Sequence, residues 1–191
     1  MPLTRLGALL MDNPRSRHSL LFVLLFLFIS ISSSDSAASV LEGTVVKVAD
    51  GDTSTVLDSE KVQHRVRIAG IDAPEKGLPF DNASGKRLGE LVARKDVRVE
   101  FDKYDRWGRI VGKVWVRPPD CPTCGMTLDV GFAQITTGMA WWYRKYAREQ
   151  SPEDQRRYEF AEQEAKAKRA GLWRDADPIP PWEFRAVQRG R

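Results

Sequence analysis

The chain has 191 residues, of which 42% are hydrophobic, and a formal net charge of +4 at neutral pH. This length is enough for one domain with a proper core and short appendages, and the sequence contains no internal repeat that would indicate a second domain. The mild excess of basic residues suits an anionic partner but does not identify one, because many solvated surfaces carry a similar balance.

Residues 1–38 differ in composition from the rest of the chain. Three arginines precede and flank an apolar run at residues 20–29, and a serine-rich stretch then ends in Ser36-Ala37-Ala38. This order is typical of a secretory signal peptide that is cleaved after Ala38. Because the apolar run is about half the length that crosses a bilayer comfortably, we favour cleavage over an uncleaved membrane anchor. We therefore expect an exported, periplasmic or extracellular protein with no stable membrane association after cleavage.

Five segments are predicted as strands because apolar and polar side chains alternate along them. They are residues 40–48, 53–57, 62–71, 97–101 and 109–116. Short polar turns at residues 50–53 and 58–61 separate the first three segments. The sequence therefore predicts an antiparallel meander at the start of the domain.

Three segments are predicted as helices, at residues 82–94, 128–139 and 152–170. The third has the strongest signals, because Ser151 is a suitable N-cap, Pro152 suits the first turn and Gly171 suits the C-terminal end. Residues 177–191 are predicted as an extended tail. Together, short strands with helices between and after them predict an α+β domain at residues 39–176. The expected architecture is a five-stranded OB-type β-barrel with three packed helices.

Cys121 and Cys124 are the two cysteines of the chain, and they lie in a proline-rich loop. A zinc site needs about four ligands, and the two histidines, one of them in the signal segment, are too few to complete it. A thioredoxin-like redox centre would place the pair after a strand and at the start of a helix, which is not the setting here. We favour a local disulfide over free thiols, since export would expose the pair to an oxidising compartment.

Acidic residues gather where two of the predicted strands begin or end. Asp50 and Asp52 lie in the turn before the second strand, and Asp72 and Glu75 flank Pro74 at the end of the third. Proline has no N–H to donate to a neighbouring strand, so the carboxylates of Asp72 and Glu75 lie where the third strand leaves the sheet. Two carboxylates and a backbone carbonyl are ligands that suit Ca²⁺ or Mg²⁺ better than zinc.

Two arginines on predicted strands complete the pattern. Arg67 and Arg109 have guanidinium groups that can each bind a phosphate through two hydrogen bonds. A third carboxylate can hold and polarise a water molecule, and these parts together are what phosphodiester hydrolysis requires. Each signal alone is more often an ordinary turn, strand end or surface ion pair, but their combination on one small barrel favours a site.

On these residues the chain resembles the staphylococcal (micrococcal) nuclease, or thermonuclease, family over roughly residues 40–174. The most specific similarities are at residues 48–53, 67–75 and 105–109, with further matches at 138–140, 165–167 and 171–173. The resemblance implies an OB-type barrel with three helices. It also implies Ca²⁺-dependent cleavage of DNA and RNA with little sequence specificity, leaving 3′-phosphates, and we expect a monomer.

The resemblance also implies a role for each matching residue. Asp52, Asp72 and the carbonyl of Ala73 match the calcium ligands, although the family's best-known member has threonine at the position of Ala73. Asp50 matches an acidic residue behind the metal ligands. The residues that match the catalytic groups are Glu75, which orients and deprotonates the attacking water, and the phosphate-binding Arg67 and Arg109.

The chain departs from the family at the expected nucleotide contacts. Arg106 and Trp107 replace a Lys-Tyr pair, and Arg144 replaces one stacking tyrosine while Tyr146 keeps the other. The loop with Cys121 and Cys124 has no counterpart in the best-known member. These differences leave base preference open. The alternative function is a non-catalytic OB-fold module that binds single-stranded nucleic acid or a partner without cutting it.

Overall fold

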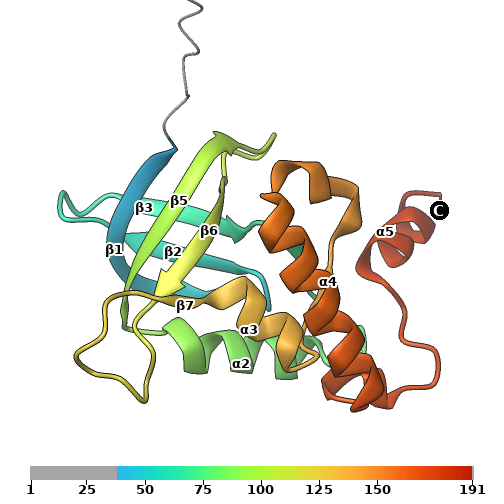
Figure 1. Ribbon diagram of the computed structural model, residues 1–191. Helices are drawn as coiled ribbons and strands as arrows, with labels where there is room; N and C mark the ends of the chain where they lie inside the picture. The colour runs from blue at the N-terminus through green and yellow to red at the C-terminus, as the bar shows by residue number, and fades with distance from the viewer. Residues whose placement is uncertain (1–37, 191) are drawn as a thin grey trace, which may run out of the picture. The chain divides into compact units, whose positions relative to one another are not determined.

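The computed structural model of the chain describes residues 38–190, so the predicted signal segment up to Ala37 lies outside the described residues. A closed barrel of five strands forms the centre of this region (Figure 1). Neighbouring strands pair antiparallel in the order β3-β2-β1-β5-β6, and a parallel pairing of β3 with β6 closes the barrel. The barrel strands are β1 (Ser39–Val48), β2 (Thr53–Leu57), β3 (Gln63–Ile68), β5 (Asp96–Tyr104) and β6 (Ile110–Val116).

The interior of the barrel is apolar because side chains alternate along its strands. In β6, Ile110, Gly112, Val114 and Val116 are buried, whereas the residues between them are partly exposed. Matching valines from the other strands fill the same core. The five-stranded barrel predicted from the alternation is therefore confirmed.

Four α-helices accompany the barrel within residues 38–190. Figure 1 shows α2 across one end of the barrel, with α3 and α4 beside it. None of the helices in this part of the chain is long and apolar enough to cross a bilayer. The helices are α2 (Asp81–Val92), α3 (Val130–Thr136), α4 (Pro152–Ala167) and α5 (Pro181–Arg189), with 3₁₀ turns at Arg144–Glu149 and Gly171–Arg174.

The start of α4 follows the predicted capping. The Ser151 hydroxyl accepts a hydrogen bond from the backbone N–H of Asp154 at 3.0 Å, and Pro152 is the first residue of the helix. The predicted helix at residues 128–139 is shorter than expected, because Leu128–Asp129 forms the short strand β7. Asp129 then caps α3 by accepting a hydrogen bond from the N–H of Phe132 at 3.0 Å.

The predicted third strand divides into two pieces. β3 ends at Ile68, and a turn at Ala69-Gly70, with φ +75° at Gly70, precedes the two-residue strand β4 (Ile71–Asp72). β4 leaves the barrel sheet and pairs with β8 (Trp141–Trp142), so that Asp72 lies opposite Trp141. The turn therefore separates Asp72 from the sheet that holds Arg67.

The prediction of an extended tail is wrong for residues 181–189, which form α5. Pro181 stands at the first turn of this helix, where its fixed φ and missing N–H are tolerated, and Glu183 lies in the same turn. Residues 175–180 before it do remain outside regular helix or strand. The end of the described chain is thus a defined helix.

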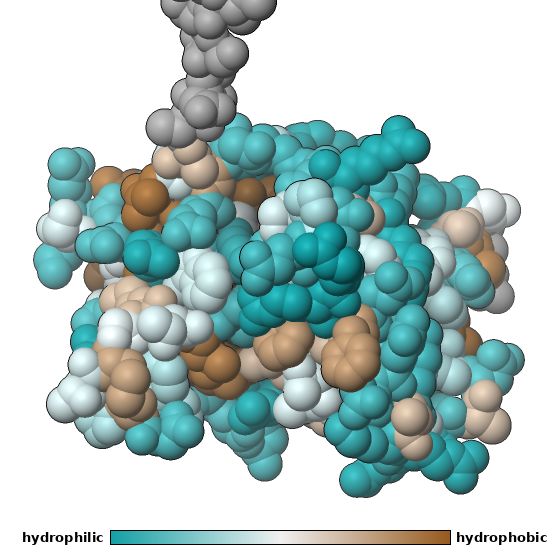
Figure 2. Space-filling view, in the orientation of Figure 1, coloured by the Kyte–Doolittle hydropathy of each residue, from teal (hydrophilic) through white to brown (hydrophobic). Residues whose placement is uncertain are grey.

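The loop between β6 and β7 contains a disulfide between Cys121 and Cys124, whose Cα atoms are 5.3 Å apart. The Arg117 guanidinium donates hydrogen bonds to the carbonyls of Pro122 and Cys124, both at 2.7 Å. The face of the molecule in Figure 2 is largely hydrophilic, and hydrophobic residues show on it only in small areas. That face offers no broad apolar surface.

Candidate active site

One arginine joins the two predicted metal-binding carboxylates. The guanidinium of Arg67 donates from Nη1 to Asp52 Oδ1 and from Nη2 to Asp72 Oδ1, both at 2.7 Å. Asp52 and Asp72 are only 4% and 0% exposed. The second oxygen of Asp52 accepts the backbone N–H of Ala73 at 2.9 Å. The structure therefore brings together four residues that the sequence predicted for one site.

Strand register explains how these residues meet. β2 and β3 pair so that Thr53 lies opposite Arg67, and the N–H of Ile68 donates to the carbonyl of Asp52 at 2.9 Å. Val66 and Ile68 face the core, so Arg67 between them faces outward. The turn at Gly70 then carries Asp72 back to the same guanidinium.

Arg109 reaches the same face from the neighbouring strand. β3 and β6 pair in parallel with Val66 opposite Ile110, and both of these residues are buried, so Arg67 and Arg109 both lie on the outer side. The Nε of Arg109 donates to Asp105 Oδ2 at 2.7 Å. Asp105 thus holds the guanidinium of Arg109 in place.

Glu75 lies at the rim of the site, with its side chain 36% exposed. Its partner is Arg185 from α5, whose Nη1 bonds to Glu75 Oε1. The same guanidinium donates to both oxygens of Asp72, from Nη1 at 3.1 Å and from Nη2 at 2.6 Å. Arg185 was not among the predicted site residues, because residues 177–191 were predicted as an extended tail.

The predicted site residues line one open groove of about 1440 Å³, except Asp72, which lies buried behind it. Trp107 is 61% exposed in this groove, and the guanidinium groups of Arg106 and Arg109 lie 4.1 and 5.1 Å from its ring centre. The predicted site residues in its lining are Asp50, Asp52, Arg67, Ala73, Glu75, Arg106, Trp107, Arg109, Arg144 and Tyr146.

Two of the predicted nucleotide contacts have partners within the protein. Arg144 forms an ion pair with the fully buried Glu162 at 2.9 Å and lies over the ring of Trp142. Tyr146 is 40% exposed and makes an edge contact with Tyr143, with ring centres 5.0 Å apart. Tyr146 is therefore presented to the groove, whereas Arg144 is partly engaged by α4.

Burial and neighbouring charges shift the pKa of two carboxylates of the site, Asp72 and Asp50. Desolvation raises the pKa of Asp72, although hydrogen bonds from Arg185 and the charge of Arg67 oppose this change. Asp50 accepts a hydrogen bond from the N–H of Asp52 at 3.1 Å. Although Asp50 retains an exposed surface, desolvation and the charge of Asp52 raise its pKa to about 6. Burial is thus the main cause of the raised pKa of both carboxylates.

The donor atoms fit a hard cation. Asp52 and Asp72 supply carboxylate oxygens held close together by Arg67, and Ca²⁺ takes six to eight oxygen ligands, including carbonyls and water. Within residues 38–190 no three or more His, Cys, Asp or Glu side chains form a metal-binding group by themselves. A cation here would therefore need the Ala73 carbonyl and water as further ligands.

Comparison with known proteins agrees with this geometry. Residues 65–175 match the family described as "Staphylococcal nuclease homologue". The chain is 40% identical to "Protein ParB" of Escherichia coli over 79% of this chain and 82% of that protein. It is 38% identical to "Micrococcal nuclease" of Shigella flexneri over 77% of this chain and 82% of the relative. It is also 39% identical to an "Uncharacterized endonuclease" of E. coli, over 76% and 85%.

The fold and the site define an OB-type barrel with paired carboxylates and arginines on one face. The chain belongs to the staphylococcal nuclease family.

Proposed function

We propose that this chain is an endonuclease that hydrolyses phosphodiester bonds of DNA and RNA with Ca²⁺ and little sequence specificity, leaving 3′-phosphates. A nuclease activity is supported by the family and by relatives named as nucleases. The observation that carries the proposal is the pair of buried carboxylates, Asp52 and Asp72, held by one guanidinium beside a groove lined with cations and aromatic rings.

The residues of the site divide the chemistry between them. Asp52, Asp72 and the Ala73 carbonyl would hold the cation, which when bound would stabilise the negative charge that develops on the phosphate. Glu75 would hold a water molecule and accept its proton at a carboxylate oxygen. Arg109, oriented by Asp105, and Arg67 would bind the phosphate oxygens.

The wider groove would hold the nucleic acid chain. Trp107 and Tyr146 present exposed rings on which bases can stack, and such stacking is tolerant of sequence. Arg106 places a charge close to the Trp107 ring, where a phosphate could be bound. This arrangement supports weak sequence preference, because no residue of the proposed contacts needs to read a base edge.

The test is cleavage of plasmid and single-stranded DNA by the purified protein with Ca²⁺ or with EGTA. We expect cleavage in the presence of Ca²⁺ and no cleavage in the presence of EGTA. Glu75→Gln is expected to lower turnover by about 10²-fold, as for loss of a general base, while the variant still binds DNA. Glu159→Gln is a matched control, because Glu159 is exposed on α4. Intact DNA in a shifted band would instead support the binding module.

We also propose that the protein is exported and acts as a monomer. The basic and apolar pattern of the first 38 residues supports export, and a disulfide in the β6–β7 loop suits an oxidising compartment. The mass of the protein recovered outside the cytoplasm tests this proposal. A mass that includes residues 1–38 would favour a retained anchor.

A further inference from the structure

The active site contains an arginine that belongs to neither the barrel nor its surrounding loops. Arg185 lies in the middle of α5 and donates to both oxygens of Asp72 and to Glu75. Burial would by itself lower the pKa of Arg185, but the hydrogen bonds to Asp72 and Glu75 outweigh it and raise the pKa above its ordinary value. Arginine stays protonated in proteins, so Arg185 places a cation at the site.

These contacts use the groups on which the proposed chemistry depends. Asp72 Oδ1 accepts from both Arg67 and Arg185, and Oδ2 accepts from Arg185. A carboxylate offers about four lone-pair sites, so three of those on Asp72 are taken. A divalent ion would approach the same oxygens to within about 2.3–2.6 Å, where the charge of the guanidinium would repel it. Arg185 and a cation are thus competitors for Asp72.

The way α5 is attached to the domain would allow Arg185 to move away from Asp72 when a cation binds there. Pro181 is the one buried residue of the helix, and Trp182 stacks on Tyr143 with ring centres 5.4 Å apart and planes 9° from parallel. Beyond Trp182, residues 186–190 are exposed. The helix is therefore fastened at its first turn, and Arg185 in its middle makes the hydrogen bonds to the acidic residues of the site.

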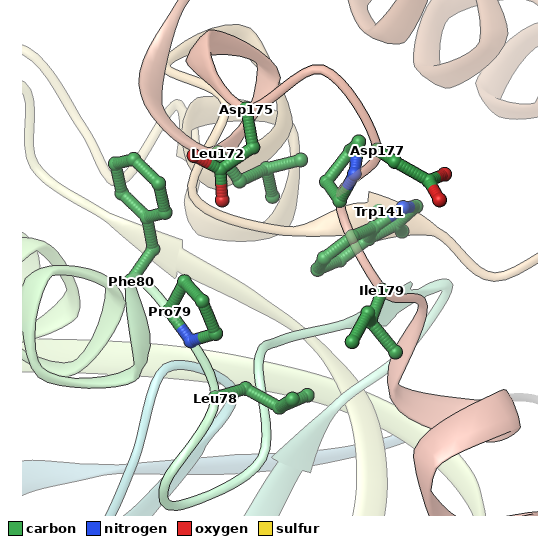
Figure 3. A pocket seen from close by; sticks show the side chains of 9 residues that line it. Leu78, Pro79, Phe80, Trp141, Leu172, Asp175, Asp177 and Ile179 are labelled. Carbon is green, nitrogen blue, oxygen red and sulfur yellow. The ribbon is translucent and has the colours of Figure 1, made fainter.

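The segment before α5 packs against the folded domain. Figure 3 shows Ile179 and Trp141 beside Leu78 around a small cavity of about 70 Å³. Leu78 and Trp141 are 7% and 4% exposed and belong to the folded domain. Trp182 packs on the same Trp141, with ring centres 6.4 Å apart, so the part of α5 beyond Trp182 can leave the groove while this packing stays in place.

We propose that α5 is a cap on the active site, and that a divalent cation bound at Asp72 displaces Arg185 and releases the helix from the groove. This inference rests on the proposed function, and it adds that cation binding and uncapping are coupled. Displacement of Arg185 also breaks its hydrogen bond to Glu75, so the carboxylate of Glu75 becomes free to bind water. The free chain is then in a closed state whose opening depends on the cation.

The first test measures Ca²⁺ binding by isothermal titration calorimetry in the purified protein. Arg185→Gln is expected to bind Ca²⁺ about tenfold more tightly than the unaltered chain, within the roughly 5- to 150-fold range of coupled sites. Arg156→Gln removes an exposed charge from α4 that does not line the groove, and it is expected to change the affinity far less. Circular dichroism spectra establish that each variant is folded.

The second test follows the helix itself by hydrogen exchange at residues 181–190. Ca²⁺ is expected to speed exchange there in the unaltered chain, and in Arg185→Gln the exchange is expected to be fast before Ca²⁺ is added. Arg185→Lys keeps the charge but loses the fork of two donors, and it should give an intermediate result in both measurements.

The outcomes separate this inference from the proposed function. Equal Ca²⁺ affinity in the unaltered chain and in Arg185→Gln, with Ca²⁺-dependent cleavage intact, would overturn the cap and leave the nuclease proposal standing. Slower exchange in α5 with Ca²⁺ would also overturn it, because Arg185 would then be retained at the loaded site. No Ca²⁺ binding by any variant would overturn both.

Discussion

Glu162 connects α4 to the strand that positions Asp72, and its replacement gives a quantitative test of the fold. Glu162 is 0% exposed and accepts the backbone N–H of Trp142 at 3.1 Å. It also forms ion pairs with Arg144 and Lys166, both at 2.9 Å. Because β8 pairs with β4, the carboxylate of Glu162 indirectly fixes the strand that carries Asp72.

The expected cost follows from what each replacement leaves without a partner. Glu162→Ala leaves the buried N–H of Trp142 without an acceptor, which costs about 1–3 kcal/mol. Arg144 and Lys166 are 48% and 44% exposed, so each lost ion pair adds only about 0–1 kcal/mol. We expect a total loss of about 1–5 kcal/mol. Glu162→Gln keeps an acceptor for Trp142, and its expected cost is about 1 kcal/mol.

Urea denaturation of both variants, followed by tryptophan fluorescence, measures these free energies of unfolding. A loss of 1 kcal/mol corresponds to a fall in melting temperature of roughly 2–4 °C for a domain of this size. Glu159→Gln on the exposed side of α4 is the control and should change stability by less than about 0.5 kcal/mol. Equal stabilities for Glu162→Ala and Glu162→Gln would refute the assignment of the cost to the N–H of Trp142.

Two further predictions concern the packing around α3 and α4. Gly138→Ala should lower the free energy of unfolding by about 2 kcal/mol or more, because Gly138 has φ +65° and an added Cβ would collide with the carbonyl of Ala170. Thermal denaturation measures this loss, and a loss below about 0.5 kcal/mol would contradict the prediction. Tyr158→Phe removes the buried hydrogen bonds to Asp129 at 2.9 and 3.0 Å and should cost about 1–2 kcal/mol near pH 7 in urea denaturation. Desolvation and the charge of Asp129 raise the pKa of Tyr158 well above 10, so the stabilisation is complete below pH 10 and is lost as the pH rises further, when the unfolded chain ionises first. The difference between the unaltered chain and Tyr158→Phe should therefore narrow above pH 10, and a constant difference would argue against it.

The sequence predicted the parts of the molecule that depend on local pattern. The alternation of apolar and polar side chains was sufficient to predict the barrel strands, and Ser151 with Pro152 was sufficient to predict the start of α4. The meeting of Asp52, Asp72 and Arg67 was also predicted, because the acidic residues flank strands that a meander brings together. These features rest on short-range periodicity and turn chemistry, which a single sequence displays directly.

Features that depend on distant packing were missed or misjudged. β4 and β8 have two residues each, too few to show alternation, and their pairing depends on tertiary structure. Pro181 and Glu183 are a helix start signal for α5, although the proline-rich residues before them favour an extended chain. The contact between Arg185 and Asp72 could not be predicted even so, because it depends on how residues 175–180 pack against the domain.

Closure of the barrel by the parallel pairing of β3 with β6 has a consequence for the unfolded protein. Arg67 and Arg109 come to the same outer side of the barrel through this pairing of segments that are distant in the sequence. A newly made or partly folded chain therefore carries all the reactive groups without an assembled centre. The proposed activity would therefore appear only once β6 has paired with β3.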